Sequence, residues 1–166
     1  MRCHWFVALC ATTRETSDVR RETVREVVTA SEAETEAFGR DLALQLGASD
    51  VVYLIGDLGA GKTTLARGLA AGSGALAREV ASPTFAILHE YAGPDGAIVM
   101  RHLDLYRLAD RVAELGVLGL PEAVAGAPIA VEWPGRAIRQ LLPPTHEITI
   151  APQPDGSRRI ELTVVT

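Results

Sequence analysis

The sequence predicts an α/β domain of three layers around a mixed sheet, in which parallel strands are joined by antiparallel hairpins. Two observations carry this prediction. A β-branched apolar run at residues 51–55 is followed by a glycine-rich loop and a helical segment, which is the order of a parallel strand and its crossover. Turn residues at 93–96 and 154–156 each separate two strand-like runs, which is typical of hairpins.

The composition suits one folded domain. The chain has 166 residues, of which 48% are hydrophobic and 22% charged, enough for a single core. With a formal net charge of −5, the chain is a poor candidate to bind nucleic acid by itself, because contacts with phosphates need clustered lysine and arginine. No apolar run approaches the length of a membrane span, so no membrane partner is expected.

The first 28 residues differ from the rest. They are expected to be an N-terminal extension, which is either a disordered tail or the result of a start codon assigned too far upstream. Residues 1–11 are apolar and faintly resemble a signal peptide, but the stretch is short and contains His4. Cys3 and Cys10 match no disulfide framework or metal site, so a reduced, cytoplasmic compartment is expected. The domain boundary is placed near Val28, with residues 29–166 as the folded unit.

Local signals predict the elements of that unit. Ser31 and Glu34 form a capping box at the start of a helix over residues 31–46, which Gly47 ends. A second helix is expected at 63–71, and short helical pieces at 110–115, 121–124 and 135–142. Besides the run at 51–55, strands are expected at 85–91, 97–106, 129–131, 147–151 and 159–165.

The loop after the first of these strands matches the phosphate-loop pattern G-x-x-x-x-G-K-[ST] at every fixed position. Its residues are Gly56, Asp57, Leu58, Gly59, Ala60, Gly61, Lys62 and Thr63, followed by Thr64. Glycines let the backbone approach phosphates closely, and the loop N–H groups with the helix N-terminus surround them. Lys62, the only lysine in the chain, would reach the terminal phosphates, and the Thr63 hydroxyl would bind Mg²⁺. The motif predicts a bound magnesium–nucleoside triphosphate but does not identify the reaction.

Two carboxylates end apolar strands, at the edge where ligands of open α/β sheets bind. Asp104 follows the run 98–103, and Glu132 follows the run 128–131. Either could be the acidic partner of the metal, and either could equally cap a loop. Ser82-Pro83-Thr84 offers two hydroxyls that could sense the γ-phosphate as switch segments do, although an ordinary turn explains the same residues.

Four segments in this order resemble the TsaE (YjeE) family of bacterial ATPases over roughly residues 29–166. They are the phosphate loop, Ser82-Pro83-Thr84-Phe85, His102-Leu103-Asp104-Leu105-Tyr106-Arg107-Leu108 and Glu132-Trp133-Pro134. The resemblance implies a small P-loop domain that hydrolyses ATP weakly. It also implies work with the partner proteins TsaD and TsaB, which attach a threonylcarbamoyl group to adenosine 37 of tRNAs that read ANN codons.

The same resemblance implies roles for individual residues. Glu132 and Thr63 would hold Mg²⁺, and Asp104 would act in hydrolysis together with Lys62 and Glu132. Trp133 would lie close to the nucleotide. Further nucleotide contacts are implied for Glu32 and for a late arginine, Arg158 or Arg159.

Several interpretations of the reaction stay open. The preferred one is an ATPase that acts on partner proteins, with ATP binding or hydrolysis resetting the TsaD-containing complex between catalytic cycles. The alternative is a P-loop small-molecule kinase, for which Arg136 and Arg139 are the only arginines in a lid-like position. A GTP switch is less favoured, because its Asn-Lys-x-Asp segment needs a lysine besides Lys62. A binding module that never hydrolyses its nucleotide is a further alternative.

Overall fold

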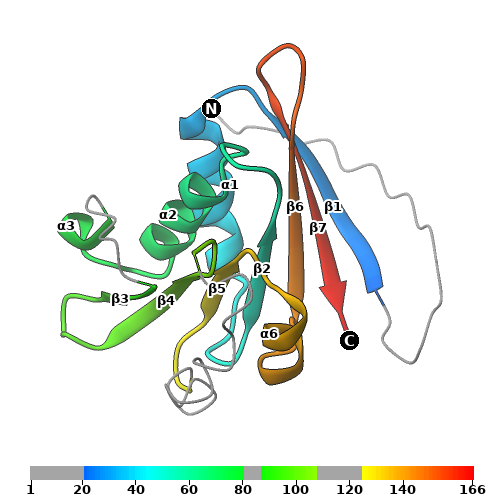
Figure 1. Ribbon diagram of the computed structural model, residues 1–166. Coiled ribbons are helices and arrows are strands. Elements are labelled where there is room, and N and C mark those ends of the chain that lie inside the picture. Colours follow the sequence, from blue (N-terminus) through cyan, green and yellow to red (C-terminus); the bar gives the residue numbers. More distant parts are fainter. Residues whose placement is uncertain (1–20, 81–86, 108–124) are drawn as a thin grey trace.

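A seven-stranded sheet in the order β1-β7-β6-β2-β5-β4-β3 forms the centre of the protein (Figure 1). The computed structural model describes residues 21–80, 87–107 and 125–166. The strands are β1 (Arg21–Thr29), β2 (Val51–Ile55), β3 (Leu88–Ala92), β4 (Ile98–Asp104), β5 (Ile129–Glu132), β6 (His146–Pro152) and β7 (Arg158–Val165). The helices in the described ranges are α1 (Glu32–Ala43), α2 (Lys62–Gly72), α3 (Ala77–Val80) and α6 (Arg136–Leu141).

The sheet is mixed, as expected. Strands β6, β2, β5 and β4 run parallel and form its middle. The β6–β7 hairpin adds β7 at one side, where β1 pairs with β7 as the edge strand, and the β3–β4 hairpin adds β3 at the other side, all in antiparallel pairs. Because parallel strands end at the same edge, the phosphate loop after β2 and the last residues of β4 and β5 are brought together there.

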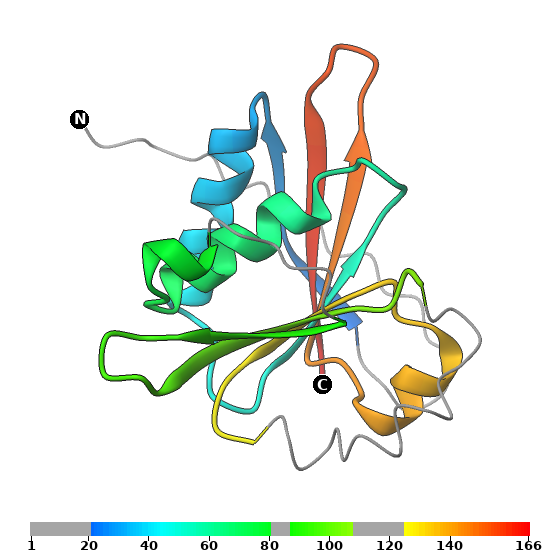
Figure 2. The same ribbon diagram turned by 60° about the vertical axis from the view of Figure 1, so that its left-hand side comes forward.

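Helices lie on both faces of this sheet, which makes three layers (Figures 1 and 2). Helices α1 and α2 cover one face in a core that includes Leu54 and Ala130. Helix α6 covers the opposite face in a second core that includes Tyr53 and Val131. Strand β2 therefore faces apolar side chains on both sides, which explains why its sequence is a continuous apolar run rather than an alternating one. The predicted fold class is confirmed.

Helices α1 and α2 touch through their backbones, and glycine is what allows this. A Cβ atom added at Gly68 of α2 would stand 2.2 Å from the carbonyl oxygen of Glu36 in α1. One added at Gly39 of α1 would stand 2.7 Å from the carbonyl oxygen of Leu65. The start of α1 is thereby held close to the start of α2, which carries the phosphate loop.

The beginning of α1 confirms the expected capping box. The Ser31 hydroxyl accepts the backbone N–H of Glu34 at 3.2 Å. The return bond differs by one position, because the Glu34 carboxylate accepts the N–H of Ala30 at 2.8 Å. The helix ends at Ala43, earlier than expected, and Leu44 after it is 78% exposed.

Strand β1 was not expected. It pairs with β7 from Arg21↔Val165 to Thr29↔Arg158, so the folded part includes residues 21–28, which the boundary near Val28 had excluded. Its sequence is rich in charged residues and lacks a clear apolar alternation. This edge strand is positioned by backbone hydrogen bonds to a strand distant in the chain, which its own sequence does not reveal. The buried hydroxyls of Thr29 and Thr35 lie 2.8 Å apart and join the strand to α1.

Some expectations fall outside the described residues. These are the character of residues 1–20, the helical pieces at 110–115 and 121–124, and the beginning of the strand expected at 85–91. Among the helices of the described ranges, none combines the length and the apolar character that crossing a membrane requires.

Candidate functional site

The phosphate loop connects β2 to α2 and needs glycine at defined points. Gly56 has a φ of 155°, and a Cβ there would stand 2.5 Å from the carbonyl oxygen of Ile150 in β6. Gly61, at the N-cap of α2, has a φ of 107°, and a Cβ there would stand 3.0 Å from Nε of Arg158. Positive φ and crowding together explain why these two positions of the motif carry no side chain.

Lys62 is the first residue of α2, and its ammonium group folds back over the loop. Nζ donates to the carbonyl oxygens of Gly56 and Asp57, both at 2.8 Å. It also lies 3.9 Å from the ring centroid of Trp133, in a cation–π contact. Burial lowers the pKa of Lys62, and the negative charges of Glu132, Asp104 and Asp57 oppose that shift. The site thus holds a buried positive charge close to three carboxylates.

Glu132 ends β5 and is 3% exposed, so its carboxylate needs partners. Two donors meet at its Oε1 atom. The Thr63 hydroxyl donates to Oε1 at 2.9 Å, and Nε2 of His102 lies 3.0 Å from the same oxygen. From the sequence, His102 was recognised only as a member of a motif. Its contact with Glu132 follows from two strands that pair in parallel, which the order of residues alone does not reveal.

Asp104 ends β4 and lies opposite Glu132 in the parallel pair β4–β5. Its Oδ1 accepts the backbone N–H of Tyr106 at 2.9 Å, in a local turn of the Asx type. The two carboxylates that the sequence singled out are therefore neighbours at one edge of the sheet. They differ in their partners, because Glu132 bonds to the phosphate-loop threonine and Asp104 bonds to its own backbone turn.

Trp133 follows Glu132 and has a φ of 57°, which is unusual for a bulky residue. This conformation directs the chain sharply out of β5. The indole ring contacts both the Lys62 ammonium group and the ring of Tyr106, whose centroid is 5.1 Å away. Tyr106, which is 51% exposed, was not predicted as a site residue, although it belongs to the segment 102–108 on which the family resemblance rests.

A cavity of about 300 Å³ lies between these groups. Its lining contains most of the predicted site: Glu32, Leu58, Gly59, Gly61, Lys62, Thr63, Thr64, Asp104, Glu132, Trp133 and Arg158, together with Tyr106. Gly56, Asp57 and Ala60 belong to the loop but do not line the cavity; the first two hold Lys62 through their carbonyl oxygens, and Ala60 is fully buried. Ser82, Pro83 and Thr84 lie outside the described residues, so their switch role stays a prediction.

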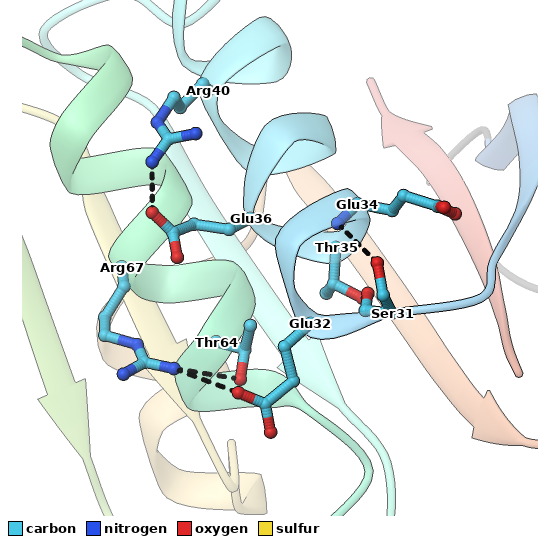
Figure 3. A network of polar contacts seen from close by, with 8 residues as sticks. All are labelled: Ser31, Glu32, Glu34, Thr35, Glu36, Arg40, Thr64 and Arg67. Carbon is cyan, nitrogen blue, oxygen red and sulfur yellow. Dashed lines mark hydrogen bonds and ion pairs between the residues drawn. The ribbon is translucent and has the colours of Figure 1, made fainter. Parts of the chain in front are cut away.

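Glu32 and the late arginine come from opposite ends of the chain. Figure 3 shows Arg67 of α2 reaching both Glu32 and Thr64, with Nη2 at 3.8 Å from Glu32 Oε2 and 3.3 Å from Thr64 Oγ1. Arg158 lies over the loop beside Gly61. Arg159 instead pairs with Glu26 of β1 at 2.8 Å, so of the two late arginines it is Arg158 that belongs to the cavity.

The donor atoms fit Mg²⁺, which the motif implies. The described residues contain no group of three or more His, Cys, Asp or Glu side chains that could hold a metal unaided. Mg²⁺ usually takes one or two protein oxygens and keeps its other positions for water and phosphate. The Thr63 hydroxyl and the Glu132 carboxylate, 2.9 Å apart beside the loop, supply such oxygens.

A strand, a glycine loop whose lysine lies at the start of a helix, and a carboxylate on the neighbouring strand define a P-loop nucleotide-binding protein. The model of the family described as "Threonylcarbamoyl adenosine biosynthesis protein TsaE" matches residues 29–160. The chain belongs to this family, and the resemblance seen in the sequence is confirmed.

Individual relatives agree with this assignment. The tRNA threonylcarbamoyladenosine biosynthesis protein TsaE of Mycobacterium leprae is 38% identical over 118 residues, which are 68% of this chain and 73% of the relative. The protein of the same name from Rickettsia bellii is 35% identical over 134 residues, 80% of this chain and 90% of the relative. The crystal structure of Bacillus subtilis YdiB matches with a TM-score of 0.67 at 32% identity, covering 91% of this chain and 90% of that one.

Proposed function

We propose that this protein is a magnesium-dependent ATPase that acts with TsaD and TsaB to form the threonylcarbamoyl group on adenosine 37 of tRNAs reading ANN codons. The proposal includes a cytoplasmic location, where the tRNA substrate is found. One observation supports the proposal beyond the phosphate-loop motif itself. The phosphate-loop Thr63 is hydrogen-bonded to the strand-end Glu132 at 2.9 Å, beside a cavity that Asp104 also lines.

Different groups of the chain would bind different parts of the magnesium–nucleotide. The loop N–H groups and the N-terminus of α2 would surround the phosphates. The Lys62 ammonium group would exchange its bonds to the carbonyl oxygens of Gly56 and Asp57 for bonds to phosphate oxygens. Mg²⁺, held at Thr63 and Glu132, would neutralise charge on the phosphates and orient them. Trp133 and Tyr106 would exclude water from one side of the cavity.

The two carboxylates are proposed to have different tasks. Glu132 is engaged with Thr63 and is assigned to the metal. Asp104 has Oδ1 held by the backbone N–H of Tyr106, and its side chain lines the same cavity. We assign Asp104 to the water that attacks the γ-phosphate, as the group that orients it and accepts its proton.

A matched pair of variants tests the role of Asp104. Asp104→Asn keeps the shape of the side chain and should lower ATP turnover while leaving affinity for magnesium–ATP nearly unchanged. Asp95→Asn is the control, because Asp95 accepts a backbone N–H two residues later in the same way, at 3.0 Å, but lies in the β3–β4 turn. Equal turnover in the Asp104→Asn variant and the parent would remove Asp104 from the chemistry.

The function as a whole is tested by reconstitution. ATP turnover is measured with this protein alone and with the TsaB–TsaD pair, and modified tRNA is counted over many cycles. We expect the partners to stimulate turnover, and Lys62→Ala to abolish both activities. Many cycles of tRNA modification without this protein, or with the Lys62→Ala variant, would contradict the proposal.

A small-molecule kinase finds less support. Of the two arginines considered for a lid, Arg139 donates to Glu147 at 2.5 Å and lies over the Tyr53 ring, on the face of the sheet covered by α6. The phosphate-loop helix α2 lies on the opposite face. A search for phosphorylated metabolites after incubation with ATP separates the alternatives, because a kinase forms them without TsaB and TsaD.

A further inference from the structure

The side chain of Glu132 is held in an asymmetric way. Within the described ranges, both hydrogen bonds to its carboxylate fall on Oε1, one from Thr63 Oγ1 at 2.9 Å and one from His102 Nε2 at 3.0 Å. The second carboxylate oxygen, Oε2, is left for a ligand of the cavity that Glu132 lines. A carboxylate acceptor requires the histidine to carry a proton on Nε2.

One hydrogen bond alone would leave this carboxylate poorly defined. The last torsion of a glutamate side chain is broad, and a single hydrogen bond tolerates a range of angles, so one donor restrains the plane of the carboxylate only loosely. A second donor on the same oxygen, approaching from another strand, restricts that rotation. His102 is suited to this because it is a rigid ring on β4, whereas Thr63 belongs to the phosphate-loop helix.

The backbone fixes His102 in place. Strands β4 and β5 pair in parallel, with His102 opposite Ala130 and Asp104 opposite Glu132. Because side chains alternate along a strand, His102 and Asp104 share one face with Glu132. The His102 side chain is 11% exposed and that of Glu132 is 4% exposed, so little water competes for their bond.

We propose that His102 is a positioning residue, which orients the Glu132 carboxylate so that Oε2 is presented to the cation of the magnesium–nucleotide. The inference rests on the proposed function, because it takes Glu132 as a metal-binding group. His102 is not among the residues that line the cavity, so it would act through Glu132. Outer partners that orient a metal-binding side chain commonly change metal affinity by about 10- to 100-fold when they are removed.

Three variants separate positioning from support of the fold. His102→Gln places an amide N–H near the position of Nε2, whereas His102→Asn is one methylene shorter and cannot reach Oε1. His146→Gln is the control, because His146 is similarly buried at 16% exposure and hydrogen-bonded to Thr145 at 2.8 Å, but begins β6 away from the cavity. Urea unfolding of each variant establishes that the measurements refer to folded protein.

The probe is Mn²⁺ with the non-hydrolysable analogue AMP-PNP, and the free cation is counted by electron paramagnetic resonance. Affinity for AMP-PNP in EDTA is measured in parallel. We expect His102→Asn to weaken Mn²⁺ binding in the ternary complex by about tenfold or more, with metal-free affinity for AMP-PNP unchanged within about twofold. His102→Gln should restore most of the loss, and His146→Gln should match the parent.

Three results would overturn the inference in distinguishable ways. If the parent binds Mn²⁺–AMP-PNP and His102→Asn binds it within twofold as tightly, His102 is a structural residue and the proposed function stands. If the parent shows no cation-dependent nucleotide binding, the proposed function fails and the role of His102 fails with it. Equal weakening of the Mn²⁺ complex in His102→Gln and His102→Asn would also refute positioning by a donated hydrogen bond.

Discussion

The backbone contact between α1 and α2 makes Gly68→Ala an informative substitution. In an ordinary helix this change stabilises the protein by about 1 kcal/mol, because alanine has the higher helix propensity and restricts the unfolded chain. Here the new Cβ would stand 2.2 Å from the carbonyl oxygen of Glu36, 2.9 Å from its carbonyl carbon and 3.0 Å from its Cα. All three atoms are backbone, so no side chain can rotate out of the way.

The cost follows from how far the helices must part. Real Cβ atoms essentially never approach a neighbour within 3.0 Å, so α2 must move from α1 by most of an ångström. Overpacking in a close-packed core costs about 1–3 kcal/mol, and the upper end applies where backbone meets backbone. After the gain of about 1 kcal/mol in propensity, the net loss is about 2 kcal/mol. For a protein of this size the melting temperature should fall by about 4–8 °C.

Urea unfolding followed by far-UV circular dichroism measures this loss. Ala71→Gly, near the end of the same helix, serves as the reference for the propensity contribution and should cost at most about 1 kcal/mol. Nucleotide affinity should also fall in Gly68→Ala, because α2 begins with Lys62 and α1 begins with Glu32, both of which line the cavity. A melting temperature equal to or above that of the parent would show that the helices separate without cost, and the argument from close packing would be wrong.

Three further outcomes are expected. A chain that begins at Thr29 should unfold at lower urea than one that begins at Arg21, because it lacks β1 and its pairs with β7; equal midpoints would mean that β1 adds no stability. Burial raises the pKa of Tyr53 to about 12, and the unfolded chain loses this proton near pH 10, so stability should fall as the pH rises through that interval. Tyr53→Phe should flatten that part of the pH profile, and an unchanged slope would exclude Tyr53 as its source. Glu132→Gln should bind ATP with little dependence on Mg²⁺, as measured by calorimetry at two magnesium concentrations; the parent's full dependence in this variant would argue against Glu132 as a metal group.

Much of the central fold follows from local signals. The apolar run of β2, the phosphate loop and the capping box at Ser31 lie within a few residues of the interactions that they predict. The strand-end positions of Asp104 and Glu132 were also predictable, because the carboxyl ends of parallel strands meet at one edge.

The remaining features depend on pairs of residues distant in the chain. Strand β1 is placed by β7, whose residues lie at the other end of the sequence, and its own charged side chains give no apolar pattern. The bond between His102 and Glu132 depends on the register of β4 against β5. The position of Arg158 over Gly61 follows from the sheet order, since β7 lies next to β6 and β6 next to β2. A single sequence carries no direct record of these pairings.

The alternation of side chains along β4 and β5 has a consequence for how such a chain can change over time. Asp104 and Glu132 share the cavity face, while their neighbours Leu103 and Val131 are fully buried in the core under α6. Deleting one residue within either strand would exchange the two sets, placing a hydrocarbon in the cavity and an acid in the apolar core. Differences in length between relatives should therefore fall in the connections before these strands and spare the strands themselves.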